Sequence, residues 1–196
     1  MTLEEFKEKT IGALPMPETL AKLFNFEENE AGLYYFQKFE LSDEEIMGVD
    51  IDDEDEYNKY IKPFSYVDSG CCAFWLKDNN EDLENAPIIY FSSEGVIRIM
   101  AKDLKTFLRM LTFDGELDDG SFYKDKRDYE ESEFRQQYIA WLKREFDLEP
   151  VLDLPENERY GDSPENTMLI EEAENLYKED FLEWHKIFCD IEDQYL

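Results

Sequence analysis

The segment from residue 86 to residue 112 constrains the fold most strongly, because three structural signals follow one another in a fixed order. Residues 87–91 (PIIYF) form a continuous apolar run, which is typical of a short strand covered on both faces. Gly95 ends a Ser-Ser-Glu-Gly turn in which glycine can adopt a positive φ. Residues 96–101 predict the next strand. The following helix is predicted from apolar residues at helical spacing, namely Leu104, Phe107, Leu108 and Leu111.

The part of the chain before this block predicts two short helices and then strands. A helix is expected over residues 2–11, because Thr2 and Glu5 have the spacing of a capping box. A second helix is expected just after Pro17, since proline is favoured at the first helical position. Asn29–Gly32 reads as a turn, and residues 68–70 as a hairpin-like turn. Alternating or apolar runs predict strands over residues 33–41, 61–67 and 71–77.

The part after the block is predicted to be mainly helical. Residues 114–131 read as a long polar loop, and Ser132 is expected to cap a helix that ends near Phe146. Residues 147–161 read as a linker, and Ser163 is expected to cap the last helix. That helix carries an apolar stripe made of Ile170, Ala173, Tyr177, Phe181, Trp184, Phe188, Ile191 and Tyr195. The stripe predicts packing against the chain's own domain; the alternative is docking on a partner or a second copy.

This order of elements indicates the α+β class, with a mostly antiparallel sheet flanked by helices and a C-terminal helical extension. The net charge of −30 disfavours binding to nucleic acid or to an anionic membrane surface. High charge is also typical of disordered chains, but 42% apolar and 15% aromatic residues predict a folded core. No signal-peptide pattern or membrane span is visible, so a cytoplasmic location is expected.

Residue chemistry alone predicts no catalytic residue, no metal ligand and no cofactor. Three cysteines are too few for a disulfide scaffold; Cys71 and Cys72 are expected on opposite faces of a strand, with a vicinal redox pair as the alternative. The single histidine, His185, is expected to be a surface or packed residue. The acidic loops lack the glycine that a calcium-binding EF-hand needs, although weak cation binding by residues 50–56 stays open. An enzyme is therefore the disfavoured alternative.

The segment from Ala86 to Leu111 resembles the SUKH superfamily, whose members show a strand, a Gly-Ser-Asp/Glu-Gly turn, a strand and a helix with a Phe-Leu-x-x-Leu core. Leu14-Pro15 followed by Leu20-x-x-Leu23-Phe24 is similar to the family's N-terminal element, with two extra residues in the spacing. The resemblance covers about residues 12–112 and departs at Ser92, where the family usually has glycine. It implies a SUKH-like core over residues 1–112. Residues 113–196 have no counterpart in the resemblance and are expected to form an acidic helical extension packed on the same domain.

The family resemblance implies a protein-binding module, because the superfamily includes bacterial toxin-immunity proteins and a fungal cell-wall-synthesis regulator. The expected function is an immunity protein that binds and neutralises a cognate, basic toxin; the alternative is an intracellular adaptor or regulator without a toxin. A strongly acidic surface would speed the encounter with a basic protein. The expected partner-contact residues are two acidic or turn segments, comprising Asp50, Asp52, Asp53, Glu54, Asp55 and Glu56 together with Ser93 and Glu94.

Overall fold

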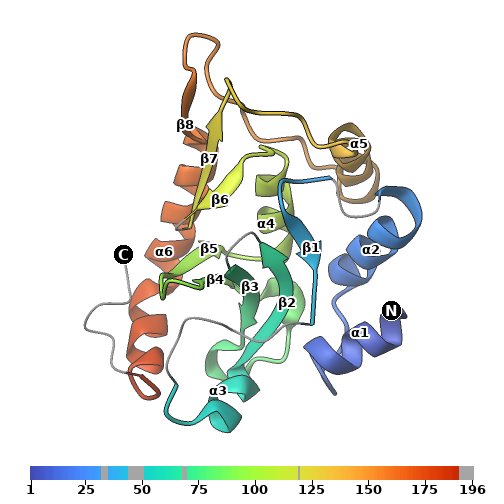
Figure 1. The fold of residues 1–196 in the computed structure, drawn as a ribbon. Helices are drawn as coiled ribbons and strands as arrows, with labels where there is room; N and C mark the ends of the chain where they lie inside the picture. Colours follow the sequence, from blue (N-terminus) through green and yellow to red (C-terminus); the bar gives the residue numbers. More distant parts are fainter. Residues whose placement is uncertain (32–34, 44–50, 68–69, 119, 190–196) are drawn as a thin grey trace.

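The described part of the computed structural model contains two antiparallel sheets and six α-helices, which confirms the α+β class (Figure 1). The structure describes the chain except for residues 32–34, 44–50, 68–69, 119 and 190–196. The elements in chain order are α1 (Leu3–Thr10), α2 (Glu18–Phe26), a π-helical turn (Glu27–Ala31), β1 (Phe39–Leu41), α3 (Glu54–Tyr60), β2 (Ile61–Val67), β3 (Gly70–Trp75), 3-10 turns (Lys77–Asn79 and Leu83–Asn85), β4 (Ile88–Ser92), β5 (Ile97–Ala101), α4 (Leu104–Leu111), β6 (Glu116–Asp118), β7 (Ser121–Asp125), α5 (Arg135–Phe146), β8 (Tyr160–Asp162) and α6 (Pro164–His185).

The larger sheet is a five-stranded meander in the order β1-β2-β3-β4-β5. All residues of its central strand β3 are buried, because helices cover both faces of the sheet. Side chains alternate along β3, so Cys71 and Cys72 join different core clusters, as the sequence predicts. The Cys71 face packs against α3 and α6, and the Cys72 face packs against α1, α2, α4 and α5 (Figure 1). The predicted buried strand within residues 86–92 is confirmed, since every residue of β4 is buried.

At most of the positions where the sequence predicts a helix to begin, a side chain caps the helix. Thr2 and Glu5 form the predicted capping box at α1. The Asp103 carboxylate accepts the Thr106 N–H at 2.7 Å at the start of α4. Ser163 caps α6 as predicted, since its hydroxyl accepts the Asn166 N–H at 3.2 Å. Each of these side chains satisfies a backbone donor that the helix itself leaves free.

Three predicted local structures are wrong. Within the strand predicted over residues 33–41, the described residues 35–38 form bends and a turn, and β1 covers Phe39–Leu41. Residues 114–131 are not one long loop, because they contain β6 and β7. Ser132 caps no helix: α5 begins at Arg135 without a side-chain cap, and Ser132 bonds elsewhere. The described part of the predicted Asn29–Gly32 turn belongs to the π-helical turn.

The second sheet comes entirely from the part of the chain beyond residue 112. It has the order β6-β7-β8, and the β7–β8 end projects from the molecule (Figure 1). Leu117 and Phe122 from this sheet lie in the same core cluster as α4 and α5. Within the described residues, the apolar stripe predicted on the last helix packs inward, because Ile170, Ala173 and Phe181 are buried. Its last two members, Ile191 and Tyr195, lie outside the described residues. The boundary between residues 112 and 113 stays a prediction.

We expect replacement of Gly70 by alanine to lower the free energy of unfolding by about 2 kcal/mol. A Cβ atom at Gly70 would lie 2.3 Å from the Phe91 carbonyl oxygen and 2.7 Å from the Tyr90 ring, both in the neighbouring strand β4. Gly12→Ala is the control, because Gly12 has a φ of +62° and a Cβ atom there would meet nothing within 4 Å. Urea unfolding should give a larger loss for Gly70→Ala than for Gly12→Ala; equal losses would contradict the steric argument.

Candidate functional site

The acidic segment expected to contact a partner lies at the start of α3. Within it, the exposed or half-buried acids are Asp52, Asp53, Glu54, Asp55 and Glu56; Asp50 lies outside the described residues. The Asp53 carboxylate caps α3 by accepting the Glu56 N–H at 3.1 Å. The Asp52 N–H donates to the Phe188 carbonyl oxygen at 2.9 Å. The segment is therefore attached to the chain just beyond the C-terminal end of α6.

Most carboxylates of this segment are left without a countercharge. Glu56 pairs with Lys59 within α3. No cation of the described chain lies within ion-pair distance of Asp52, Glu54 or Asp55. These three acids therefore present unneutralised negative charge at the surface.

The second predicted contact, Ser93-Glu94, occupies the turn between β4 and β5. Both residues are exposed, and Gly95 has a φ of +88° as the turn requires. The buried Ser92 hydroxyl accepts the N–H groups of Glu94 and Val96 at 3.1 and 3.2 Å. Ser92 is not among the described residues with positive φ, so serine at this position needs no left-handed backbone. Its side chain supplies hydrogen bonds that hold the turn.

The two predicted contact segments adjoin opposite ends of the central strand β3. The segment at α3 runs into β2 at Ile61, which pairs with Trp75 at one end of β3. The β4–β5 turn follows Ser92, which pairs with Gly70 at the other end of β3. Five residue steps of strand separate these ends, or about 17 Å at a rise of roughly 3.3 Å per residue. A partner that used both segments would have to reach along the full length of β3.

Part of the acidic charge on the C-terminal extension is used inside the molecule. Three bases of the β5–α4 block pair with glutamates of α6. The pairs are Arg98 with Glu174 (3.1 Å), Lys102 with Glu172 (2.8 Å), and Arg109 with Glu165. The extension is thus matched electrostatically to the slightly basic block on which it packs. Each partly exposed pair contributes little energy, but the set fixes how α6 lies along β5.

His185 is a packed histidine inside the fold. Its side chain is fully buried, and its Nδ1 lies 3.1 Å from the Tyr57 hydroxyl of α3. Its Nε2 lies 3.2 Å from the Cys189 sulfur, and burial lowers the pKa of His185 to about 4. The neutral imidazole can hydrogen-bond both neighbours, so this contact joins α3 to the end of α6. Burial also raises the pKa of Tyr57.

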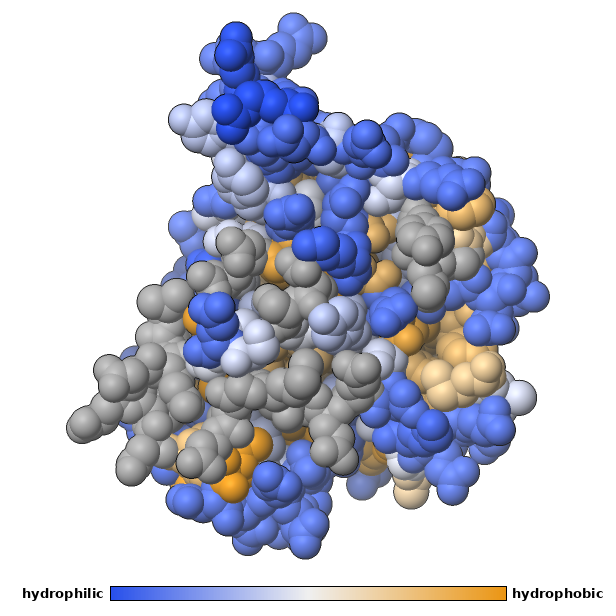
Figure 2. All heavy atoms as spheres, in the orientation of Figure 1, coloured by the Kyte–Doolittle hydropathy of each residue, from blue (hydrophilic) through white to orange (hydrophobic). Residues whose placement is uncertain are grey.

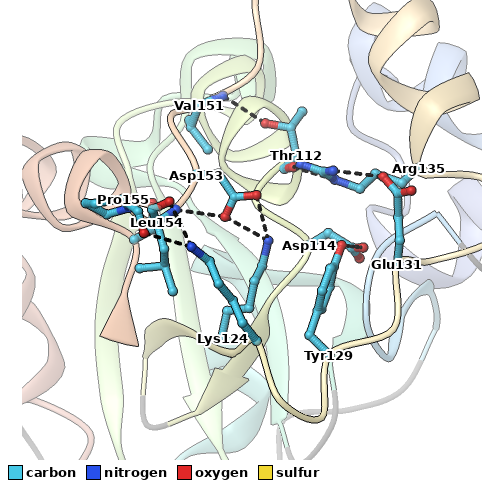
Figure 3. A network of polar contacts seen from close by, with 12 residues as sticks. Thr112, Asp114, Lys124, Tyr129, Glu131, Arg135, Val151, Asp153, Leu154 and Pro155 are labelled. Atoms are coloured by element: carbon cyan, nitrogen blue, oxygen red, sulfur yellow. Dashed lines mark hydrogen bonds and ion pairs between the residues drawn. The ribbon is translucent and has the colours of Figure 1, made fainter. Parts of the chain in front are cut away.

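A buried carboxylate, which the sequence did not single out, organises the segment before α5 (Figure 3). Asp114 is fully buried and accepts three hydrogen bonds. The donors are the Tyr129 hydroxyl (2.6 Å), the Ser132 N–H (2.8 Å) and the Ser132 hydroxyl (2.6 Å). Asp114 has a φ of +56°, a conformation that aspartate and asparagine adopt more readily than most residues. The sequence signal that could have pointed to Asp114 is its position between Phe113 and Gly115, just after α4.

A buried lysine lies beside this carboxylate network (Figure 3). The Lys124 ammonium group bonds the two Asp153 carboxylate oxygens at 3.1 and 3.3 Å. It also lies 4.4 Å from the Phe113 ring centroid and 4.3 Å from that of Tyr129. Burial lowers the pKa of Lys124. Because lysine and its acid come from β7 and from the segment before β8, the pair connects these two parts of the extension.

The described residues contain neither a metal site nor a membrane-spanning helix. No group of three or more His, Cys, Asp or Glu side chains there is arranged to hold a metal ion. None of the described helices is both long and apolar enough to cross a membrane. Comparison with protein-family models, with curated proteins and with solved structures finds no significant match.

Proposed function

We propose that this chain is a protein-binding module that recognises a basic protein surface, and that it acts as an immunity protein by binding and neutralising a cognate basic toxin. The observation that carries the proposal is the acidic charge left over after the chain's own cations are paired. Arg98, Lys102 and Arg109 are each occupied by a glutamate of α6. At the start of α3, Asp52, Glu54 and Asp55 have no ion-pair partner among the described residues, and only Glu56 pairs, with Lys59. The resemblance of residues 86–111 to SUKH proteins supports the immunity role.

The physical basis of the proposal is electrostatic steering and occlusion. A net charge of −30 raises the encounter rate with a cationic protein, and this effect weakens as salt screens the charges. A basic toxin that acts on nucleic acid exposes a cationic groove, and an acidic protein can cover that groove. The face seen in Figure 2 is largely hydrophilic, most strongly over the projecting β7–β8 end. An adaptor without a toxin would use the same surface.

The function is tested with the product of the neighbouring open reading frame. We expect this product to arrest growth when expressed alone, and co-expression of the present chain to restore growth and yield a complex. A product that causes no growth arrest, or an arrest that the present chain does not relieve, would contradict the immunity role. A harmless product that still forms the complex would favour the adaptor.

We expect removal of the negative charges at the start of α3 to slow association with that product. The test variant is Asp52→Asn, Asp53→Asn, Glu54→Gln and Asp55→Asn; asparagine at position 53 keeps the helix cap. At low salt the association rate constant should fall about tenfold, and the difference should shrink as salt rises. The matched control replaces four exposed acids elsewhere, namely Glu4, Glu8, Glu156 and Glu158, by glutamine. Equal rates for both variants would remove the α3 segment from the interface.

A further inference from the structure

An open groove of about 640 Å³ lies between the β1 region and the segment that precedes α5. Phe36 and Phe39 form one wall with the turn before β1, and Tyr66 of β2 contributes a half-buried ring. The opposite wall is the segment of residues 130–133. The groove was not among the predicted contact surfaces, because its two walls are about ninety residues apart in the sequence.

The walls of this groove are held in place by polar contacts. The Gln37 side-chain amide spans from one wall to the other and donates to the Glu130 carbonyl oxygen at 2.8 Å and to the Ser132 hydroxyl at 3.2 Å. Behind the second wall, the buried Asp114 accepts the N–H and the hydroxyl of Ser132. The groove is therefore built into the fold before any partner binds.

The rim of the groove is strongly acidic. Its acids are Glu40, Glu130, Glu131 and Glu133. Glu131 pairs with Arg135, whereas no ion pair engages Glu130 or Glu133 within the described chain. Among the described residues that line the groove, Lys38 is the one base. A second hollow of about 400 Å³ shares Gln37 and Glu130 with it and adds Glu116 and Asp128, so the acidic surface continues beyond the first groove.

A partner strand cannot pair with the whole length of the β1 edge. The Leu41 N–H is already bonded to the Glu27 carboxyl at 3.3 Å. Such a contact occupies a backbone donor that an added strand would need, so recognition at this edge depends on side chains. The side chains on offer are carboxylates beside the half-buried Tyr66 ring, and that combination suits guanidinium and ammonium groups through ion pairs and cation–π contacts.

We propose that this groove binds an extended arginine- and lysine-rich segment of a protein partner. The inference deepens the proposed function, because it names the chemistry of the partner segment and places it away from the α3 acids. Charge complementarity with the Glu130–Glu133 wall selects a basic segment, and the Tyr66 ring provides a face for one of its cations.

The proposal is tested with a fluorescein-labelled peptide of alternating arginine and serine, by fluorescence anisotropy at low and moderate salt. The groove variant is Glu130→Gln with Glu133→Gln, and the control is Glu4→Gln with Glu8→Gln, which changes the net charge equally. We expect the dissociation constant to rise about tenfold for the groove variant and less than twofold for the control. Tyr66→Leu should raise it about threefold without any change in charge.

Two outcomes overturn the proposal. Equal weakening by the groove and control pairs would mean that the peptide senses only the net charge. Loss of concentration-dependent self-association in the groove variant alone, measured by sedimentation, would assign the groove to a second copy of this chain. The co-expression growth assay separates this inference from the proposed function. If the groove variant still relieves the toxin's growth arrest fully, the immunity role stands and the groove has no part in it.

Discussion

Asp114→Ala is expected to lower the free energy of unfolding by about 4 kcal/mol. The change removes the acceptor for the Tyr129 hydroxyl and for both donors of Ser132, all in partly buried positions. Each hydrogen bond left unmade there costs about 1–3 kcal/mol. It also places alanine at a φ of +56°, which costs roughly 1 kcal/mol more. Urea or thermal unfolding followed by circular dichroism measures the loss.

Further variants separate the two contributions. Asp114→Gly relieves the backbone conformation but not the hydrogen bonds, so it should recover only about 1 kcal/mol. Asp147→Ala is the matched control, because Asp147 has a φ of +55° but an 87% exposed side chain at the end of α5. It should cost about 1 kcal/mol. If Asp114→Ala cost no more than Asp147→Ala, the buried network would not stabilise the fold.

The parts of the fold that the sequence predicted are those in which local pattern and tertiary burial agree. Residues 87–101 form two buried strands with a tight turn, and their apolar runs leave little alternative. The helix that follows presents its apolar residues on one face, and Asp103 marks its start. The last helix was equally clear from Ser163 and Pro164, because capping is decided by neighbouring residues alone.

The predicted strand over residues 33–41 failed because tertiary contacts of one aromatic residue override the local pattern. Tyr35 is fully buried, with its ring centroid 4.7 Å from that of Tyr138 and 5.5 Å from that of Phe26. Its hydroxyl donates to the Glu27 carboxyl at 2.5 Å. The two aromatic partners lie on α5 and α2, and no pattern within the predicted strand can reveal them.

Residues 114–131 show the opposite failure, in which a polar composition conceals strands. In β7, Phe122 and Lys124 point inward, but a lysine at an inward position breaks the usual alternation of apolar and polar residues. Its burial depends on Asp153, which lies far along the chain. For the same reason the sequence could indicate acidic contact segments but not the groove, whose walls meet only in the folded chain.

Glu27→Gln is expected to remove a pH dependence from the stability of the protein. Burial raises the pKa of Glu27 to about 8, well above its ordinary value of 4.5. The native state therefore holds a proton that the unfolded state releases between these two pH values, so the contribution of Glu27 to stability is lost as pH rises from about 4.5 to 8. The slope is about 1.4 kcal/mol per pH unit, which amounts to several kcal/mol across the window.

Glutamine suits this site because both donors, the Tyr35 hydroxyl and the Leu41 N–H, bond the same carboxyl oxygen. An amide can keep both bonds and carries no charge at any pH, so the variant should match the wild type near pH 5 and exceed it near pH 8. Glu28→Gln is the control, since Glu28 is exposed on the same turn. If Glu27→Gln and Glu28→Gln gave parallel stability curves, the raised pKa of Glu27 would be contradicted.

His185 contributes a slope of the opposite sign, which acts on the acid side of the stability curve. Its pKa is lowered from 6.5 to about 4, so its contribution is complete above pH 6.5 and is lost as pH falls toward 4. Between about pH 4.5 and 6.5 the two contributions change in opposite directions by similar amounts, so together they leave the wild-type curve nearly flat in this range. Glu27→Gln removes only the alkaline slope, and the acid slope from His185 stays. The stability maximum should therefore move to higher pH, and denaturant midpoints measured from pH 4 to pH 9 report that movement directly.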